Sequence, residues 1–296
     1  MKVTMLGTGA ALPDPDRGHT SILITVNEKQ YLFDCGNGAT RQLIRANVDP
    51  STVDVVFLTH LHMDHIADLP FFLLSGWICD RKVKPSIIGP PGTKEFVDHS
   101  LENGAFAVDI NARAQFPQRR DSMEMIRPDI SIVTPGLVYE DENIKVYADY
   151  VEHIESEFMH CFGFRVEAGD KVVTFSGDTA PSEALLRLAQ DADVLIHECS
   201  FPEEALEFRK KVGIGTFAHT SPIELGKIAT QANVKTLIPT HFAHFDTTSP
   251  IVKKYLAKHM PIEAVGPEML DSVANDIREN FKGSLQLGRD LLRVDV

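Results

Sequence analysis

The sequence is poor in cysteine. Its four cysteines are scattered along 296 residues without a CxxC pair: Cys35, Cys79, Cys161 and Cys199. This spacing argues against a disulfide framework and against a structural zinc knuckle. No basic and apolar leader precedes the first strand-like residues, so the sequence shows no sign of a secretion signal. We therefore expect reduced, mostly buried thiols and a cytoplasmic protein.

The sequence also lacks a basic charge excess and a long hydrophobic run. Its formal net charge of −13 disfavours tight nucleic-acid binding, because surfaces that bind nucleic acid are normally basic. The most apolar stretch, residues 69–78, is too short to span a bilayer. No linker, low-complexity tract or internal repeat interrupts the chain. We therefore predict a single domain over residues 1–296, without a membrane partner.

The distribution of apolar residues predicts strands followed by helices. Strands are expected at 3–6, 21–26, 30–35, 53–58, 86–89, 143–151, 161–167, 171–176, 194–197, 236–239 and 291–296. Helices are expected at 39–46, 67–79, 92–101, 182–190, 203–211 and 222–232. Residues 103–135 show no clear pattern, which predicts an irregular excursion near the site. Two strand-rich halves, each followed by helices, indicate two sheets packed face to face with helices outside.

A cluster of histidines follows the predicted strand at 53–58. It places four ligand-type side chains within six positions: His60, His62, Asp64 and His65. The alternation of His60 and His62 can turn two imidazoles toward one point, while Asp64 and His65 could reach a second ion. Imidazole and carboxylate without thiolate are the ligands of a hydrolytic zinc centre, for which Mn²⁺ or Fe²⁺ could substitute. A His-rich surface loop is the alternative, but such a loop does not require ligand types at this density.

Three more ligand-type residues follow predicted strands: His153, Asp178 and His241. Strand ends on one edge of a packed sheet can converge, and functional residues collect on the loops that leave such an edge. Each residue alone would be weak evidence. Their shared placement predicts that they join the histidine cluster in a site for two metal ions.

With these residues the sequence resembles the metallo-β-lactamase superfamily. The pattern HxHxDH at 60–65, followed in order by His153, Asp178 and His241, is similar to the five motifs of that superfamily. Further motifs resemble its ribonuclease Z branch: LGTGAALP at 6–13, LFDCG at 32–36, GPPG at 89–92, SGDT at 176–179 and HECS at 197–200. The resemblance implies an α/β fold, a four-layer αββα sandwich, with a dinuclear zinc site at the edges of the sheets.

The resemblance also implies a role for each motif residue. The implied ligands form two sets that share Asp178 and a hydroxide: His60, His62 and His153 for one Zn²⁺, and Asp64, His65 and His241 for the other. Two such ions lower the pKa of the bridging water and polarise the scissile bond. Glu198 and His219 match the pair that protonates the leaving group in the ribonuclease Z branch. Alternatively, His219 could have no catalytic role and simply precede the start of a helix. The predicted catalytic residues are thus Asp64, Glu198 and His219.

One departure from the ribonuclease Z pattern bears on the substrate. Only 24 residues separate His153 from Asp178, an interval that holds a long Gly-rich, tRNA-binding arm in tRNA-processing members. Relatives without the arm include phosphodiesterases for small substrates and arylsulfatase-like enzymes. We therefore predict a dinuclear zinc hydrolase in which a bridging hydroxide attacks a phosphodiester, carboxylic ester or lactone of a small molecule. The alternatives are an RNA endonuclease without the arm and a non-catalytic ligand-sensing protein on the same fold.

A few residues outside the motifs have weaker predicted roles. Asp34 is expected to orient a ligand histidine through a hydrogen bond, and His244 to contact a ligand or the substrate. Four arginines of the excursion could bind an anionic substrate or form a solvated basic face: Arg113, Arg119, Arg120 and Arg127. Aromatic residues in the helix expected at 67–79 are typical of core or oligomer contacts, so the chain could form a homodimer.

Overall fold

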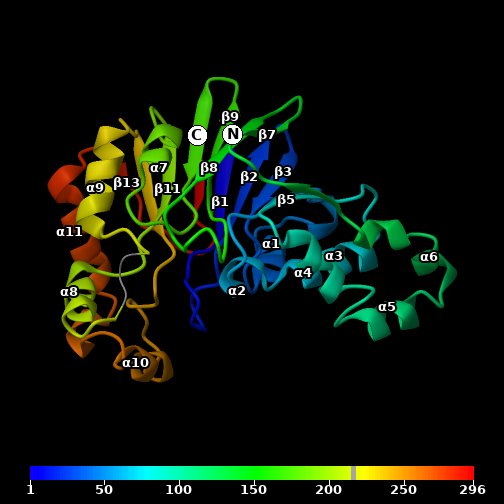
Figure 1. Ribbon diagram of the computed structural model, residues 1–296, viewed down its shortest axis with the longest axis horizontal. Helices are drawn as coiled ribbons and strands as arrows, with labels where there is room; N and C mark the ends of the chain where they lie inside the picture. Colours follow the sequence, from blue (N-terminus) through cyan, green and yellow to red (C-terminus); the bar gives the residue numbers. More distant parts are fainter. Residues whose placement is uncertain (215–217) are drawn as a thin grey trace.

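The computed structural model describes residues 1–214 and 218–296, which form two seven-stranded sheets with helices on their outer faces (Figure 1). The first sheet has the order β14-β1-β2-β3-β4-β5-β6. Its strands are β1 (Lys2–Gly7), β2 (Ser21–Val26), β3 (Lys29–Phe33), β4 (Val55–Phe57), β5 (Ser86–Gly89), β6 (Asp129–Ile132) and β14 (Arg293–Asp295). The last strand pairs antiparallel with the first, so the two ends of the chain lie side by side.

The second sheet has the order β13-β12-β11-β10-β9-β8-β7. Its strands are β7 (Gly136–Glu140), β8 (Lys145–Tyr150), β9 (Phe162–Ala168), β10 (Lys171–Phe175), β11 (Val194–Glu198), β12 (Thr236–Thr240) and β13 (Ser284–Leu285). Strands β10, β11, β12 and β13 run parallel, so their carboxyl ends lie on one edge of the sheet. This edge carries much of the candidate site.

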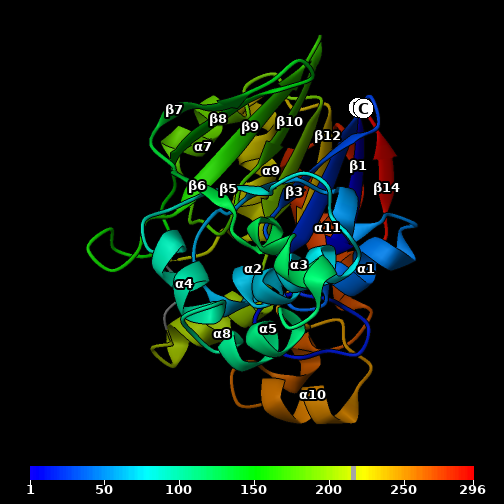
Figure 2. The same cartoon turned by 90° about the vertical axis from the view of Figure 1, so that its right-hand side faces the viewer.

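Helices cover both outer faces of the sandwich, which confirms the predicted four-layer αββα architecture (Figures 1 and 2). The first sheet is covered by α1 (Ala39–Arg45), α3 (Leu69–Ile78) and α4 (Thr93–Ser100). The second is covered by α7 (Glu183–Leu188), α8 (Glu203–Lys211), α9 (Pro222–Gln231), α10 (Pro250–Leu256) and α11 (Met269–Asn280). Serine hydroxyls cap α7, α9 and α10 by accepting a backbone N–H three residues on: Ser182, Ser221 and Ser249.

Apolar side chains fill the space between the two sheets. Phe57 of the first sheet stacks on its neighbour Phe33, with ring centroids 4.6 Å apart. It also meets Phe164 of the second sheet edge-on, at a centroid distance of 5.8 Å. Because strand neighbours alternate between faces, the opposite faces of the same strands pack against the helices. Burial on both sides fixes the strands whose ends carry the ligand-type residues.

The excursion at 103–135 contains more regular structure than its sequence indicates. It holds α5 (Ala107–Arg113), α6 (Pro117–Arg120), a short 3₁₀ segment and β6, and its helices project away from the sheets (Figures 1 and 2). Trp77 of α3 anchors it by donating a hydrogen bond to Ser122 Oγ at 3.0 Å. Its four arginines pair with nearby carboxylates, and none lines the candidate pocket: Arg113, Arg119, Arg120 and Arg127. They therefore behave as a solvated, salt-bridged face.

Several other features bear on the sequence predictions. Three cysteines are free and buried, while Cys79 is free and exposed, as expected for reduced thiols. In α3, Phe72 and Trp77 are core residues, whereas Phe71 is 55% exposed and could contact another copy of the chain. The homodimer therefore stays a prediction. Among the described residues, no helix is both long enough and apolar enough to cross a membrane.

Candidate metal centre

The predicted ligand residues follow strand ends on one edge of the sandwich. His60 and His62 leave β4, His153 leaves β8, Asp178 leaves β10 and His241 leaves β12. Between His62 and α3, the chain forms the single turn α2 (Met63–Ile66), which carries Asp64 and His65. The structure thus brings all seven residues together in two adjacent groups.

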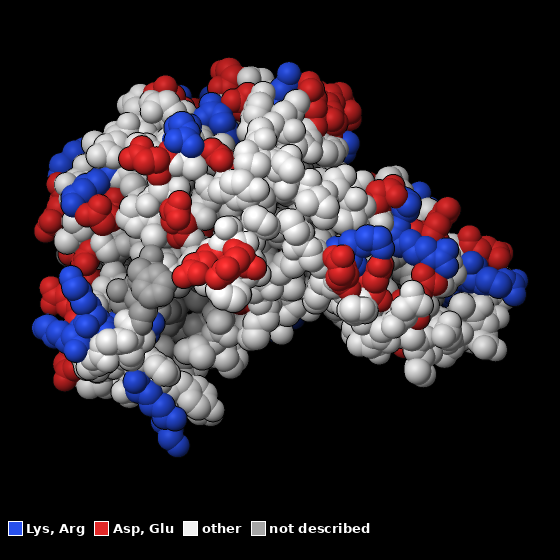
Figure 3. All heavy atoms as spheres, viewed as in Figure 1, with Lys and Arg blue, Asp and Glu red and all other residues white. Residues whose placement is uncertain are grey.

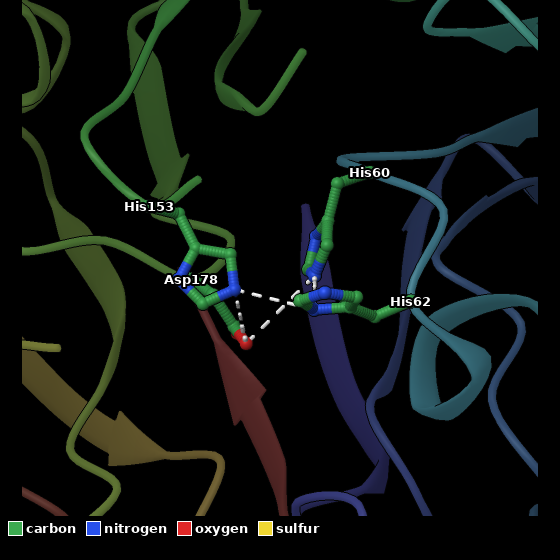
Figure 4. A group of neighbouring side chains, drawn as sticks. All are labelled: His60, His62, His153 and Asp178. Atoms are coloured by element: carbon green, nitrogen blue, oxygen red, sulfur yellow. Dashed lines mark hydrogen bonds and ion pairs between the residues drawn. The ribbon is translucent and has the colours of Figure 1, made fainter. Parts of the chain in front are cut away.

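The first group contains three imidazoles and one carboxylate: His60, His62, His153 and Asp178 (Figure 4). Nδ1 of His62 lies 3.1 Å from Nε2 of His60 and 3.2 Å from Nε2 of His153. Ligand atoms around a tetrahedral zinc with bonds of 2.0–2.1 Å lie roughly 3.3 Å apart. The three nitrogens therefore have the mutual spacing of ligands to one ion.

The second group contains Asp64, His65 and His241. Nε2 of His241 lies 3.4 Å from Nε2 of His65 and 3.2 Å from Oδ2 of Asp64. This spacing again suits a tetrahedral ion. The donor set of two imidazoles and a carboxylate is one that Zn²⁺, Mn²⁺ and Fe²⁺ all accept.

Asp178 lies between the two groups. Its Oδ2 is 3.8 Å from Nε2 of both His60 and His153, and 3.2 Å from Nε2 of His241. Its Oδ1 is buried without a hydrogen-bond donor, 3.4 Å from Nε2 of His65. A buried carboxylate oxygen left without a donor is costly unless a cation satisfies it. This oxygen and the spacing of the imidazoles are the observations that fit the site to two metal ions.

The protonation of the first group and of Asp64 is compatible with metal binding, whereas a metal ion would have to displace a proton from His65. Burial would lower the pKa of His65, but the carboxylates of Asp178 and Asp34 raise it well above its usual range. Burial lowers the pKa of His60, His62 and His153, so these rings stay neutral at pH 7 and can offer a lone pair. Burial alone would raise the pKa of Asp64, but a hydrogen bond to His241 and the nearby His65 hold it below its usual range. The carboxylate is therefore ionised at pH 7.

Hydrogen bonds behind the cluster fix the orientation of its rings. Nδ1–H of His65 donates to Oδ2 of Asp34 at 2.7 Å, which leaves Nε2 facing the second group. Asp34 also accepts hydrogen bonds from the backbone N–H and the hydroxyl of Thr59, both at 2.8 Å. Nδ1–H of His153 donates to the carbonyl of Ala218 at 2.9 Å. Partners of this kind set the tautomer of a ligand histidine and orient its ring.

Two residues of the site have left-handed backbone conformations that are unusual for residues other than glycine. They are Asp34, with φ of 56°, and His241, with φ of 57°. Each sits just after a strand, where the left-handed turn redirects the side chain toward the cluster. Strain of this kind persists only where the surrounding structure holds it, and it concentrates at functional sites. Nearby, a Cβ at Gly36 would lie 2.2 Å from the carbonyl oxygen of Asp64, so only glycine lets the turn after β3 approach α2.

Glu198 and His219 form a hydrogen-bonded pair beside the metal cluster. Nδ1 of His219 lies 3.1 Å from Oε1 of Glu198, which also accepts the N–H of Thr220 at 2.9 Å. Burial would lower the pKa of His219, but the Glu198 carboxylate outweighs it and raises the pKa to about 9. A ring nitrogen of His219 also lies within 4.8 Å of the potential ligand atoms of Asp178 and His241. The His219 ring therefore lies directly beside the ligand cluster.

A pocket of about 610 Å³ opens over the cluster. Its floor includes His62, Asp64, His153, Asp178 and His241. Its walls are mostly apolar, and they come from separate parts of the chain: Ala10, Ala11, Leu12, Met63, Phe201, Arg209, Leu256, His259 and Met260. Met63 and residues 10–12 belong to motifs that the sequence shows, but the remaining wall residues do not stand out in the sequence, because the packing of distant helices places them.

His244 does not contact the ligand cluster. Its Nε2–H donates to the carbonyl of Ala10 at 3.0 Å, and its Nδ1 lies 3.7 Å from Asp14. His19 holds the same loop by donating from Nε2 to the carbonyl of Leu12 at 3.2 Å. Both histidines therefore support the loop at 10–12 that forms one side of the pocket. The contacts of His244 thus connect it to the pocket through this loop.

Comparison with known proteins gives matches over most or all of the chain. Residues 1–208 match the family model "Anti-Pycsar protein Apyc1". A protein named ribonuclease Z from Mycobacterium bovis is 30% identical over 300 residues, covering 100% of this chain and 98% of the relative. Because the alignment covers nearly all of both chains, that relative cannot contain a long arm that is absent from this chain.

Solved structures share the fold. The metallo-β-lactamase fold protein YhfI from Bacillus subtilis superposes with a TM-score of 0.72 at 19% identity, covering 99% of this chain and 98% of that one. The short form of human tRNase Z superposes with a TM-score of 0.68 at 22% identity, covering 100% and 99%. These structures have the same arrangement of sheets, and at this level of identity they are evidence for the fold alone.

Proposed function

Because the chain belongs to the Anti-Pycsar protein Apyc1 family of metallo-β-lactamase-fold hydrolases, we propose that it is a dinuclear metal-dependent phosphodiesterase for cyclic nucleotides. The observation that carries the proposal is the combination of two ligand groups sharing Asp178 with a proton-donor pair, at the floor of a pocket of about 610 Å³. The proposed metal is Zn²⁺, with Mn²⁺ or Fe²⁺ as substitutes, since the donors are imidazole and carboxylate.

The proposed ligands are the seven clustered residues: His60, His62, Asp64, His65, His153, Asp178 and His241. When bound, the two ions would activate a water for attack and neutralise charge on the phosphoryl oxygens. Asp34 holds the ring of His65 in place, and the carbonyl of Ala218 does the same for His153. The chain itself therefore supplies orientation and a fixed pattern of charge.

We assign proton delivery to His219. A sugar oxygen that leaves a phosphodiester is a poor leaving group and must receive a proton as the P–O bond breaks. His219 carries a proton at pH 7 because Glu198 raises its pKa to about 9. Glu198 also fixes the ring through Nδ1, so that Nε2–H is the proton available to the leaving oxygen.

The size and charge of the pocket favour a small substrate. Pockets of 300–1,000 Å³ bury small ligands almost completely. Figure 3 shows a hollow with acidic side chains above it and basic side chains below it. Next to His153, a second recess is lined by Glu152 and Glu155. Those carboxylates and the net charge of −13 oppose a long polyanion that would have to cross them. A cyclic nucleotide places only one phosphate at the site.

A substrate panel tests the proposal. We expect the purified, metal-loaded protein to hydrolyse 3′,5′- or 2′,3′-cyclic nucleotides with higher kcat/KM than bis-p-nitrophenyl phosphate, aryl esters, lactones or aryl sulfates. Hydrolysis of a lactone or aryl ester with no activity on any phosphodiester would overturn the proposal. The ester and lactone substrates thus remain the direct competitors within the same mechanism.

A ribonuclease Z-like RNA endonuclease is the second candidate. Two observations favour it: the 30% identity to a relative of that name, and the basic side chain of Arg209 in the pocket wall. The matching length of that relative removes the missing arm as an argument against RNA. A 3′-extended pre-tRNA at physiological salt separates the two candidates, because efficient and specific 3′ cleavage would favour the endonuclease. A non-catalytic sensor would not need the Glu198–His219 pair.

A further inference from the structure

One side of the pocket contributes no metal ligand. It consists of Phe201, which follows β11, Arg209 of α8, and three residues at or after the end of α10: Leu256, His259 and Met260. We call these five residues the distal wall. Because they line the same pocket as Asp64 and Asp178, they offer a surface to the remaining atoms of a molecule whose phosphate lies at the metal centre.

Phe201 and Arg209 form a stacked pair within the distal wall. The guanidinium carbon of Arg209 lies 4.4 Å from the centroid of the Phe201 ring. The same ring meets His219 edge-on, with centroids 5.8 Å apart and planes at 75°. Phe201 therefore connects the proposed proton donor to Arg209. The stack fixes the guanidinium plane, which lowers the entropy lost when its N–H groups bind a ligand.

The chemistry of this pair suits a flat group that carries carbonyl oxygens. Phe201 and the apolar side chains of Leu256 and Met260 offer a surface for an aromatic ring. The guanidinium has only donors, so it bonds carbonyl oxygens but repels an amino group, and in adenine the ring nitrogens N1 and N7 both flank the amino group. Uracil, cytosine and guanine present a carbonyl oxygen, whereas adenine has an amino group and no carbonyl.

We propose that the distal wall is the nucleobase subsite, in which the base lies against the apolar side chains of the wall with its edge toward Arg209, and Arg209 donates hydrogen bonds to a base carbonyl. This inference rests on the proposed function, because it takes the phosphodiester to lie at the metal centre. It makes Arg209 a specificity-determining residue that favours carbonyl-bearing bases over adenine. Since the base is remote from the reacting bond, the contact acts on KM more than on kcat.

The test compares substrates with and without a base. The 3′,5′-cyclic phosphate of 1-deoxyribose has the reacting group and the sugar but no base. For Arg209→Ala, we expect kcat/KM on 3′,5′-cyclic UMP, CMP and GMP to fall about 10–100-fold, the worth of a hydrogen bond to a charged group. The fall on cyclic AMP should be smaller, and kcat/KM on the abasic cyclic phosphate should change less than about twofold.

Two further variants make the test specific. Lys211→Ala removes an exposed charge from the same helix outside the pocket, so it should leave all substrates unchanged. Phe201→Leu keeps an apolar side chain but removes the ring, and it should weaken all four cyclic nucleotides alike while sparing the abasic substrate. Metal content and thermal melting of each variant confirm that the fold is retained.

The outcomes separate this inference from the function on which it rests. If the native protein cleaves no cyclic phosphate, the proposed function fails. If it cleaves them but Arg209→Ala lowers nucleotide and abasic substrates equally, Arg209 serves the phosphate or the fold, and the nucleobase subsite is rejected. Unchanged activity of Arg209→Ala on the carbonyl-bearing nucleotides rejects it as well.

Discussion

The hydroxyl of Ser200 lies 2.9 Å from Nδ1 of His241 and links this proposed ligand to the Glu198–His219 pair, the proposed proton donor. The same oxygen lies 2.8 Å from Oε2 of Glu198 and 3.2 Å from Nδ1 of His219. When Nε2 of His241 binds a metal, its Nδ1–H donates to Ser200, and the hydroxyl proton of Ser200 is left for Glu198. One carboxylate thus orients both a ligand through Ser200 and the proton donor directly.

Ser200→Ala should therefore weaken the second metal site. Loss of the partner that holds a ligand histidine typically lowers metal affinity or activity 10–100-fold. We expect a loss of this size in the affinity of the more weakly held ion, measured by titration with a competing chelator. Ser200→Thr keeps the hydroxyl and should retain near-native affinity. Equal affinity in Ser200→Ala and the native protein would show that His241 is held by other contacts.

The metal content of variants should distinguish Asp178, the ligand proposed to be shared by both ions, from residues that bind only one ion. We expect the native protein, purified without chelator, to bind two ions per chain, measured by plasma mass spectrometry. Asp178→Ala should deplete both ions, because its carboxylate lies within reach of both groups. His153→Ala should deplete mainly one, because His153 belongs to the first group alone. A single ion in the native protein, or loss of only one in Asp178→Ala, would contradict the shared carboxylate.

The rate should depend on the protonation of His219. Because Glu198 raises the pKa of His219, the protonated donor is present below that pKa and is lost as the pH rises through it. The value is about 9 in the protein without metal, and nearby cations would lower it. Glu198→Gln removes the carboxylate charge, so burial dominates and the pKa falls.

The pH profile of kcat measures this effect. We expect an alkaline limb in the native enzyme, and we expect Glu198→Gln to move that limb to lower pH by one unit or more. Glu95→Gln is the matched control, since it removes the charge of an exposed carboxylate on α4, a helix that covers the other sheet. An alkaline limb at the same pH in Glu198→Gln and the native enzyme would assign the limb to another group.

The fold could be predicted largely because its central strands are buried on both faces. Phe33, Phe57 and Phe164 each lie in a strand whose residues are mostly apolar, and each strand ends at a turn. Most ligand residues lie just after such strands, and His153 follows the alternating strand β8, so their convergence follows once the strands share an edge. This is why the sequence alone could place His153 and His241 with the distant histidine cluster.

Elements with weak local patterns were missed. Strand β6 is at the edge of its sheet and largely exposed, and β13 has only two residues, so neither has a usable alternation. Helix α11 had a readable signal, since Met269, Val273 and Ile277 recur every four residues and are all buried. Helix α10 begins with a serine cap and a proline, a start signal that could also have been read.

The pocket walls could not be predicted from the sequence. Arg209 and Met260 lie at or beyond the ends of helices whose residues resemble those of any surface helix, and only tertiary packing brings them to one pocket. Ser200 is different, because it stands two residues after Glu198 in the HECS motif. A hydroxyl so close to a buried carboxylate was a signal for a hydrogen-bond partner.

The leaving-group dependence of His219→Ala tests its assignment as the proton donor. A positioned general acid typically contributes 10²–10⁴-fold to the rate. We expect kcat on a cyclic nucleotide to fall by that factor in His219→Ala, because the sugar oxygen cannot leave without a proton. On bis-p-nitrophenyl phosphate the loss should be small, since p-nitrophenolate leaves without protonation.

Metal content decides between this role and a ligand role for His219, which lies within metal-binding distance of Asp178 and His241. As a proton donor, His219 can be removed without loss of either ion. As a ligand, its removal would release metal and slow both substrates equally. An equal loss on good and poor leaving groups therefore rejects the donor role, and retained metal with a selective loss on the cyclic nucleotide establishes it.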